Sequence, residues 1–409
     1  MIALPLPEVS ALCPGQLDAR QSATEVTGVQ VDSRRVVDGD LFVAVGRGSD
    51  FRSDALAQGA AATLLPDDPF ASLTALARAV RARSSARVVA ITGSYGKTTT
   101  KDILAAIAGM QRRTVAAERS FNNEIGVPLT LCRLEHDTEI CIVELAMRGF
   151  GQIAELSALA QPQIGVVVAV GPVHLEKVGT LEGVARAKGE LVAALPAGGT
   201  AIVPAGFAVD RNDLEVVRVG EDLRVESFDP PVLRTTLGEL EVNFTARHLA
   251  TNALCALAAA RALGLELPSR LEVGFVDWRN QELELPDGGL LINDAWNANP
   301  ISMRAALEHL RDRAHGRRTI AVLGEMAELG GYSDEGHEEV ARAVREVGVD
   351  VLIAVGARAK AYGGQWVATR EQALELLRNA LRPGDCVLLK GARVLELEHL
   401  AEALVPVGA

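Results

Sequence analysis

The segment VVAITGSYGKTTT, residues 88–100, constrains the fold of this chain more than any other feature. It reads as a buried strand, a glycine turn and a helix that starts near Lys97. In that layout, backbone N–H groups and a helix N-terminus surround phosphate, Lys97 reaches the terminal phosphates, and the Thr98 hydroxyl binds Mg²⁺. Gly93 and Gly96 enclose only two residues, fewer than in the usual P-loop. A turn that merely needs glycine would leave the lysine and threonine unexplained, so we predict an ATP-binding loop.

Length, composition and charge narrow the class of protein. A chain of 409 residues exceeds what one core organises, so two or three domains are expected. With 48% apolar and 4% aromatic residues, the chain suits alternating strands and helices. A net charge of −12 argues against nucleic acid as the main partner. The longest apolar runs have the length of strands, so no membrane span is expected.

Cysteine usage and the first residues indicate the compartment. No CxxC spacing is present, and most cysteines lie among apolar neighbours. Buried thiols are therefore expected rather than zinc ligands or disulfides, which fits a reducing cytoplasm. The opening residues MIALPLPEVS have neither a basic region nor a sustained apolar run, so no signal peptide is expected. The cysteines are Cys13, Cys132, Cys141, Cys255 and Cys386.

Strand and helix patterns divide the chain into three blocks, and the predicted fold class is α/β with three domains. Residues 1–84 are expected to form a small α/β domain, 85–274 a central P-loop domain with a parallel sheet, and 275–409 a Rossmann-like doubly wound domain. The segment RARSSAR is a plausible linker before the central domain. An Ala-rich helix is expected over 246–263. The expected strands are 41–45, 63–65, 88–92, 140–144, 164–170, 200–203, 290–293, 319–323, 351–355 and 386–390.

Polar residues follow two strands of the central block. Glu144 ends the run 140–144, and His174 comes shortly after the run 164–170. Ligands of parallel sheets bind beyond the carboxyl ends of the strands, where these side chains and the glycine loop would meet. Alone, His174 is more often a structural histidine and Glu144 could be a helix cap. Their shared location favours a magnesium site, since Mg²⁺ prefers oxygen ligands and retains waters and phosphates.

Lys188 lies on the apolar stripe of a predicted helix. In LEGVARAKGELVAAL the hydrophobic residues fall at helical spacing, and Lys188 shares their face. A buried ammonium is costly unless it is paired or chemically altered. A lysine whose stem covers the core while its amine reaches water explains the pattern equally well.

Further residues fit a cleft between the second and third domains. His248 and Asn252 lie one helical turn apart, and Asn252 could bind an adenine edge or the backbone. Asp294 and Lys390 each follow or end a predicted strand, although Asp and Asn at a helix start are most often caps. Arg279 alone does not indicate a functional role, because exposed arginines are ordinary.

Several segments together resemble the Mur ligase family, across all three blocks. The segment SFNNEIGVPLTL is the most specific, and the Thr-Thr-Pro and DNPR motifs of the ligase that adds the third peptide residue are absent. The other matching segments are VDSRRVVDGDLFVAV, TGSYGKTTTK, GPVHLEKVGTLEGVARAKGEL, INDAWNANPISMRAAL, VLGEMAELG and LLKGAR.

The resemblance implies an ATP-dependent amide ligase of cytoplasmic peptidoglycan synthesis, on which cell shape and division depend. It would add D-alanyl-D-alanine to UDP-N-acetylmuramoyl-tripeptide through an acyl phosphate. The first domain would bind the UDP-sugar, the second ATP, and the third would close on ATP and bind the dipeptide, with hinges near residues 85 and 275. Two Mg²⁺ ions and a carbamylated Lys188 are implied. The partners would be small molecules, with no nucleic acid or membrane, and the chain would be a monomer.

The resemblance also implies residue roles. Catalytic residues would be Lys97, Lys188, His174 and Arg279. ATP would be bound by Gly93, Ser94, Gly96, Lys97, Thr98, Thr99, Asn252, Arg279 and Asp294. Metal ligands would be Thr98, Glu144, His174 and Lys188. Substrates would be bound by Ser33, Arg34, Asn122, Asn123, Asn297, Asn299, Lys390 and Arg393.

The chain departs from the family pattern at a few positions, and other readings remain open. Trp296 stands where tyrosine is usual, Glu325 where aspartate is common and Gln152 where glutamate is frequent. The first-domain segment GRGSDFRSDAL is short and lacks the family's Asp-Gly-His. A sibling ligase (the third-residue or folyl-polyglutamate type), a nucleotide-driven switch or motor, and a non-catalytic binding protein are the alternatives. Phosphate release that needs both an acyl acceptor and an amine would distinguish a ligase from a switch.

Overall fold

The computed structural model of the protein describes residues 1–173 and 175–405. Its described residues form two compact units, each built from several stretches of sequence. The first unit comprises residues 1–169, 187–224 and 252–271, and the second comprises the described parts of residues 170–186, 225–251 and 272–409.

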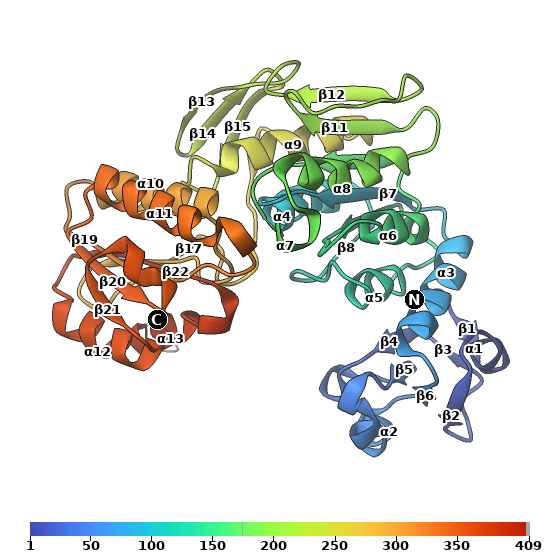
Figure 1. Cartoon of the computed structure of the whole chain (residues 1–409). Helices are drawn as coiled ribbons and strands as arrows, with labels where there is room; N and C mark the ends of the chain where they lie inside the picture. The colour runs from blue at the N-terminus through green and yellow to red at the C-terminus, as the bar shows by residue number, and fades with distance from the viewer. Residues whose placement is uncertain (174, 406–409) are drawn as a thin grey trace. The chain divides into compact units, whose positions relative to one another are not determined.

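The N-terminal residues of the first unit form a small α/β region, as predicted (Figure 1), in which β1 and β3 pair as a separate antiparallel ribbon beside a four-stranded sheet. Its elements are β1 (Leu4–Pro5), α1 (Leu6–Leu12), β2 (Gly15–Ala19), β3 (Glu25–Val26), β4 (Gly28–Gln30), β5 (Asp40–Val43), α2 (Arg52–Gln58), β6 (Ala62–Pro66) and α3 (Pro69–Arg83). The strand order is β2-β6-β5-β4, with β5 parallel to both neighbours. The carboxylate of Asp68 starts α3 by accepting hydrogen bonds from the N–H groups of Phe70 and Ala71.

A six-stranded parallel sheet forms the central part of the first unit. Its strands, in spatial order, are β12 (Glu215–Val219), β11 (Thr200–Pro204), β10 (Ile164–Val167), β7 (Arg87–Thr92), β9 (Ile140–Glu144) and β8 (Thr114–Ala116). The strands predicted over 88–92, 140–144 and 200–203 are therefore confirmed. β10 ends at Val167, before the predicted residue 170, and beyond it the carbonyl of Ala169 accepts a hydrogen bond from the N–H of Ser94 in the glycine loop. The remaining elements of this region are α4 (Lys97–Gly109), α5 (Gly126–Leu131), α6 (Gln152–Ala160), α8 (Leu181–Ala193), α9 (Leu249–Ala262) and β16 (Arg270–Leu271).

The second unit contains an antiparallel three-strand segment and a second large sheet. The antiparallel strands are β13 (Val225–Asp229), β14 (Val232–Thr235) and β15 (Gly238–Val242). The large sheet runs β17 (Gln281–Glu284), β18 (Leu290–Asn293), β22 (Cys386–Lys390), β19 (Thr319–Gly324), β20 (Val351–Val355) and β21 (Gln365–Val367). Only β17 is antiparallel to its neighbour in this sheet. The helices of the unit are α7 (Leu175–Val178), α10 (Pro300–Ala314), α11 (Ser333–Val347), α12 (Arg370–Ala380) and α13 (Glu398–Leu404).

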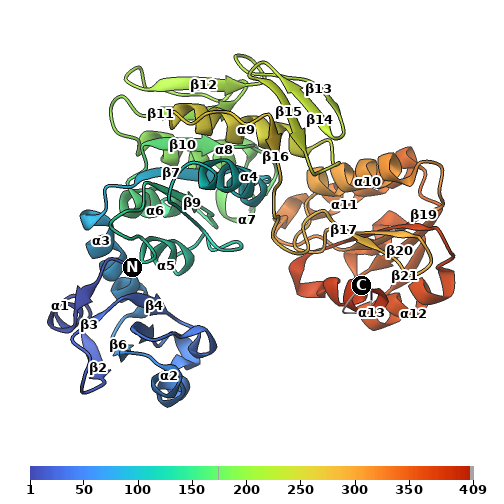
Figure 2. The same cartoon turned by 180° about the vertical axis from the view of Figure 1, so that it is seen from behind.

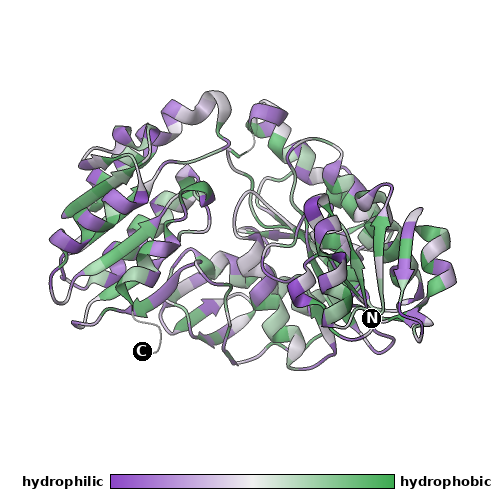
Figure 3. Ribbon diagram, turned by 90° about the horizontal axis from the view of Figure 1, so that it is seen from below, coloured by the Kyte–Doolittle hydropathy of each residue, from purple (hydrophilic) through white to green (hydrophobic). Residues whose placement is uncertain are grey.

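Helices cover both faces of the large sheet in the second unit. Alternate strand residues point to opposite faces, so Ile292 and Leu388 pack with α10 and α11, while Leu291 and Val387 pack with α12 and α13. Figures 1 and 2 show these helix pairs on the two sides of the sheet. Figure 3 shows hydrophobic strands between helices that carry hydrophilic positions. Burial of each large apolar side chain contributes about 1.5–3 kcal/mol, which makes this double-sided layer the core of the unit.

The predicted fold class is confirmed, since the described residues form a small mixed sheet near the N-terminus and two six-stranded, largely parallel sheets wrapped by helices, beside two smaller sheets. The boundaries at residues 84 and 274 stay predictions. None of the described helices has both the length and the apolar character that crossing a bilayer requires. The carboxyl ends of the parallel strands carry the candidate site residues of each unit.

Candidate active site

The glycine loop of the first unit joins β7 to α4 as the sequence predicts. Gly96 caps α4 with φ +79°, a left-handed conformation that favours glycine. A Cβ at Gly96 would lie 2.5 Å from Oδ1 of Asn252 and 2.9 Å from Cγ1 of Val168, so a side chain cannot fit. The Lys97 amine donates a hydrogen bond to the Gly93 carbonyl at 2.9 Å. A lysine folded over a helix N-terminus is an arrangement that binds phosphate.

Residues predicted to bind ATP lie around this loop. Asn252 comes from α9, is buried, and has its side-chain oxygen against Gly96. Ser94 and Thr99 are also buried, and the Ser94 N–H is fixed by the carbonyl of Ala169. The first unit therefore brings the predicted adenine contact and the phosphate loop together.

Three polar side chains lie around Glu144 at the carboxyl end of β9. Its Oε2 accepts a hydrogen bond from the Thr98 hydroxyl at 2.8 Å, and its Oε1 accepts one from the Asn122 amide at 2.7 Å. The Ser120 hydroxyl lies 3.5 Å from the Thr98 hydroxyl. Glu144 and Thr98 are buried. Sequence reasoning did not assign Ser120 a role, although it begins the SFNNEIG segment that we singled out.

Lys188 is buried in α8, with 2% of its surface exposed. Burial, and then the charge of Lys97, lower the pKa of the Lys188 amine well below its ordinary value. Among the described residues no hydrogen bond or ion pair reaches its amine. The snorkelling alternative is therefore excluded, and the neutral amine is favoured. His174 lies outside the described residues, and the described part of the chain holds no cluster of three His, Cys, Asp or Glu side chains suited to a metal.

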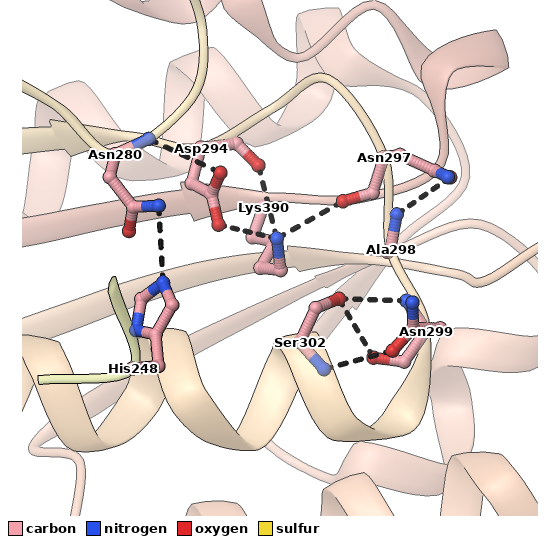
Figure 4. Close-up of polar contacts among 8 residues, drawn as sticks. All are labelled: His248, Asn280, Asp294, Asn297, Ala298, Asn299, Ser302 and Lys390. Atoms are coloured by element: carbon pink, nitrogen blue, oxygen red, sulfur yellow. Dashed lines mark hydrogen bonds and ion pairs between the residues drawn. The ribbon is translucent and has the colours of Figure 1, made fainter. Parts of the chain in front are cut away.

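In the second unit, Asp294 and Lys390 join the ends of β18 and β22 (Figure 4). The Lys390 ammonium is paired with the Asp294 carboxylate and donates a hydrogen bond to the Asn297 carbonyl at 3.0 Å. The other carboxylate oxygen accepts a hydrogen bond from the Asn280 N–H at 3.3 Å. Lys390 is 2% exposed, so the ammonium holds the backbone of this turn in place.

The predicted substrate residues after β18 form the start of α10 (Figure 4). The Asn297 side-chain oxygen accepts a hydrogen bond from the Ala298 N–H at 2.8 Å. Asn299 and Ser302 form a reciprocal capping box, in which each side chain accepts a hydrogen bond from the other's N–H. Both asparagines therefore shape the turn, and their contacts with substrate stay predictions.

Arg279 lies between two residues with strained backbone and beside two stacked indoles. Trp278 and Asn280 have φ of 65° and 48°, a region that residues other than glycine rarely adopt. The Trp278 and Trp296 rings stack with centroids 5.9 Å apart. The guanidinium carbon of Arg279 lies 5.4 Å from the Trp296 ring centre, and that of Arg393 lies 5.0 Å from Trp278 and 5.5 Å from Trp296. Sequence reasoning missed Trp278, although it directly precedes Arg279 in the chain.

His248 contacts the same group of residues through Asn280. The Asn280 amide lies 3.3 Å from Nε2 of His248 (Figure 4). Burial lowers the pKa of His248 to about 4, against an opposing effect of the Asp294 charge. The imidazole is therefore neutral at pH 7.

The predicted substrate residues near the N-terminus differ in exposure. Ser33 is buried, whereas the Arg34 side chain is 86% exposed and pairs with the Asp32 carboxylate at 2.7 Å. This hydrogen bond lowers the pKa of Asp32 to about 2. The Asn123 side-chain oxygen accepts hydrogen bonds from the N–H groups of Ile125 and Gly126. Their contacts with substrate stay predictions.

A phosphate loop on a parallel sheet, beside a buried carboxylate and hydroxyls, defines a nucleotide-binding α/β protein. The family model of the Mur ligase middle domain matches residues 91–260, and that of the Mur ligase, glutamate ligase domain matches residues 278–393. The chain belongs to the Mur ligase family.

Curated relatives and solved structures match over nearly all of the chain. The UDP-N-acetylmuramoyl-tripeptide--D-alanyl-D-alanine ligase of Mycobacterium leprae is 34% identical and aligns over 100% of this chain and 99% of its own. The ligase of the same name from Escherichia coli K12 is 32% identical, over 99% of each chain. A crystal structure of MurF from Acinetobacter baumannii has a TM-score of 0.83 and 26% identity, covering 98% of each chain. MurF from Thermotoga maritima in complex with ADP has a TM-score of 0.79 and 25% identity, covering 92% of this chain and 96% of that one.

Proposed function

We propose that the protein is an ATP-dependent amide ligase that adds D-alanyl-D-alanine to UDP-N-acetylmuramoyl-tripeptide in peptidoglycan precursor synthesis. The match over the full length to ligases of that name carries the proposal. The glycine loop and the Glu144 cluster, which retain the polar contacts a phosphate and metal site needs, support an active enzyme over a degenerate copy.

The reaction would proceed through an acyl phosphate. The terminal carboxylate of the tripeptide attacks the γ-phosphate of ATP and releases ADP. The free amine of D-Ala-D-Ala then attacks the acyl carbon, loses a proton, and the tetrahedral intermediate expels phosphate. Charge must be neutralised as carboxylate approaches phosphate, a role we assign to Lys97 and Arg279. Exclusion of water is also required, because an acyl phosphate hydrolyses.

We assign the remaining ATP contacts by family position. Asn252 would bind adenine, and Asp294 would bind the ribose or phosphate side. The position of Asn252 against the glycine loop supports its assignment, and the ion pair with Lys390 would orient the Asp294 carboxylate. The phosphates would be held by Gly93, Ser94, Gly96, Lys97, Thr98 and Thr99.

The donor set around Glu144 fits Mg²⁺, because carboxylate and hydroxyl oxygens are the ligands that this ion prefers. Thr98, Glu144 and His174 would hold the metal, which would supply positive charge at the phosphates. Lys188 would complete the set as a carbamate. Burial favours the neutral form of its amine. The neutral amine is the form that adds to carbon dioxide, with loss of a proton.

Substrate contacts and cellular setting complete the proposal. Ser33, Arg34, Asn122 and Asn123 would face the UDP-muramoyl substrate. Five buried cysteines without disulfides suit the reducing cytoplasm, where ATP and UDP-linked precursors are available. We expect a monomer acting on small molecules.

Phosphate release tests the function. ATP and Mg²⁺ are supplied with UDP-muramoyl-tripeptide and D-Ala-D-Ala, singly and together, and products are identified by mass. We expect release only with both, together with a UDP-muramoyl-pentapeptide. Release with neither substrate would indicate a switch or motor, and release with another acyl acceptor and amine only would indicate a sibling ligase.

A further inference from the structure

Arg393 lies just beyond the carboxyl end of β22, in the short 3₁₀ helix Arg393–Leu395 of the second unit. Its guanidinium faces the stacked pair Trp278 and Trp296, with its central carbon 5.0 and 5.5 Å from the two ring centres. A planar guanidinium on indole faces has a fixed orientation and loses little freedom when it binds a ligand.

Glu398 fixes one edge of the same guanidinium. Nη1 of Arg393 is paired with the Glu398 carboxylate, whose side chain is 1% exposed. The Arg393 side chain is nevertheless 42% exposed, and it makes no other hydrogen bond in the described part of the chain. Its remaining N–H groups are therefore available to an anion that approaches from solvent.

The other cation of the KGAR segment is not available in this way. Lys390 is 2% exposed, and its ammonium is already paired with Asp294 and bonded to the Asn297 carbonyl. Arg279 contacts the same indole, Trp296, as Arg393 does. The proposed reaction brings two kinds of anion to this part of the protein: the phosphate, assigned to Arg279, and the carboxylate of the dipeptide.

We propose that Arg393 binds the C-terminal carboxylate of the incoming D-Ala-D-Ala, and so makes the ligase select amines that carry a free carboxylate. The inference rests on the proposed function. A guanidinium donates two parallel hydrogen bonds to a carboxylate, which gives both strength and direction. With the carboxylate held, the amine at the other end of the dipeptide is positioned for attack. Arg393 is thus a specificity-determining residue that contacts the substrate away from the reacting atoms.

Steady-state kinetics with two acceptors test this assignment. D-Ala-D-Ala is compared with D-alanyl-D-alaninamide, which keeps the amine and lacks the carboxylate, in the wild type and in Arg393→Gln. We expect the wild type to show a KM for the amide about 10- to 100-fold higher than for the dipeptide, the range for loss of charge-assisted hydrogen bonds. Arg393→Gln should raise the KM for the dipeptide to that of the amide and leave the KM for ATP unchanged.

The control is Arg345→Gln, which removes an exposed arginine from α11. It should keep the wild-type ratio of the KM for the amide to the KM for the dipeptide. If Arg393→Gln folds poorly, the double variant Arg393→Gln/Glu398→Gln takes its place, because it leaves no buried carboxylate without its cation. It should give equal KM values for the amide and the dipeptide, as expected for the single variant. A ratio in the Arg393 variants equal to that of the wild type, or a wild type that uses both acceptors equally, would overturn the inference while ligation stands. A wild type that forms no amide with D-Ala-D-Ala would instead refute the proposed function.

Discussion

Replacing Lys390 with methionine should destabilise the second unit strongly. The ammonium of Lys390 is paired with Asp294 and bonded to the Asn297 carbonyl, and both charged side chains are largely buried. Methionine keeps the length and apolar stem of the side chain, so the change removes the charge and its hydrogen bonds with little change in packing.

The expected loss of stability depends on the hydrogen bonds that Asp294 keeps. Without Lys390, the Asp294 carboxylate keeps, within the described part of the chain, only the hydrogen bond from the Asn280 N–H, at the long distance of 3.3 Å. Removing one partner of a buried ion pair costs about 3–5 kcal/mol, because the other charge stays buried. Adding Asp294→Asn to Lys390→Met removes that charge, so the double variant should regain about 2 kcal/mol.

Tryptophan fluorescence during denaturation with urea measures this effect selectively. The three tryptophans, Trp278, Trp296 and Trp366, all lie in the second unit, so their signal reports its unfolding. Arg345→Met, at an exposed position of α11, is the control. A Lys390→Met variant within about 1 kcal/mol of the wild type would refute the reasoning, since that is the cost of one ordinary hydrogen bond. A double variant no more stable than the single one would refute it too.

Three further predictions concern the active site and the pH response. Lys188→Ala should lower kcat by about 100-fold or more, with partial rescue by added short carboxylates; normal turnover without bicarbonate would contradict the carbamate. Asn252→Ala should raise the KM for ATP about 10-fold and leave that for the UDP-substrate unchanged, whereas equal changes in both would count against an adenine contact. Because the pKa of His248 falls from 6.5 to about 4 on folding, the unfolded chain binds the proton first, and stability should drop by about 3 kcal/mol between pH 6.5 and 4. Tryptophan fluorescence in urea at several pH values measures this drop, and His248→Gln should reduce it; an unchanged slope would exclude this histidine as the cause.

The elements most visible in the sequence were those fixed by local patterns. The strand before the glycine loop and the helix from Lys97 follow from an apolar run, glycines at the turn and the change of periodicity. The burial of Lys188 followed from its place on an apolar stripe, although the pattern left its environment open. The alternative that Asn at a helix start is a cap is correct for Asn299.

The sequence did not predict which side chains far apart in the chain pair with each other. Asn122 bonds to Glu144 across 22 residues of sequence, and Lys390 pairs with Asp294 across 96. Such pairs depend on which strand ends the sheet order brings together, and the sheet places β22 beside β18. The stack of Trp278 on Trp296 could not be predicted for the same reason. Trp296 was visible as a departure from the family pattern, but the sequence does not show which ring it contacts.

The hydrogen bonds of Glu144 leave part of its acceptor capacity unused. Its two oxygens accept one hydrogen bond each, from Thr98 and from Asn122, whereas a carboxylate offers about four lone-pair sites. A divalent cation can therefore bind Glu144 without displacing either donor, and the Thr98 hydroxyl can donate to Glu144 while its own oxygen faces the cation. Thr98 and Asn122 fix the orientation of the carboxylate before a cation arrives, and a ligand that is already oriented loses little conformational freedom on binding.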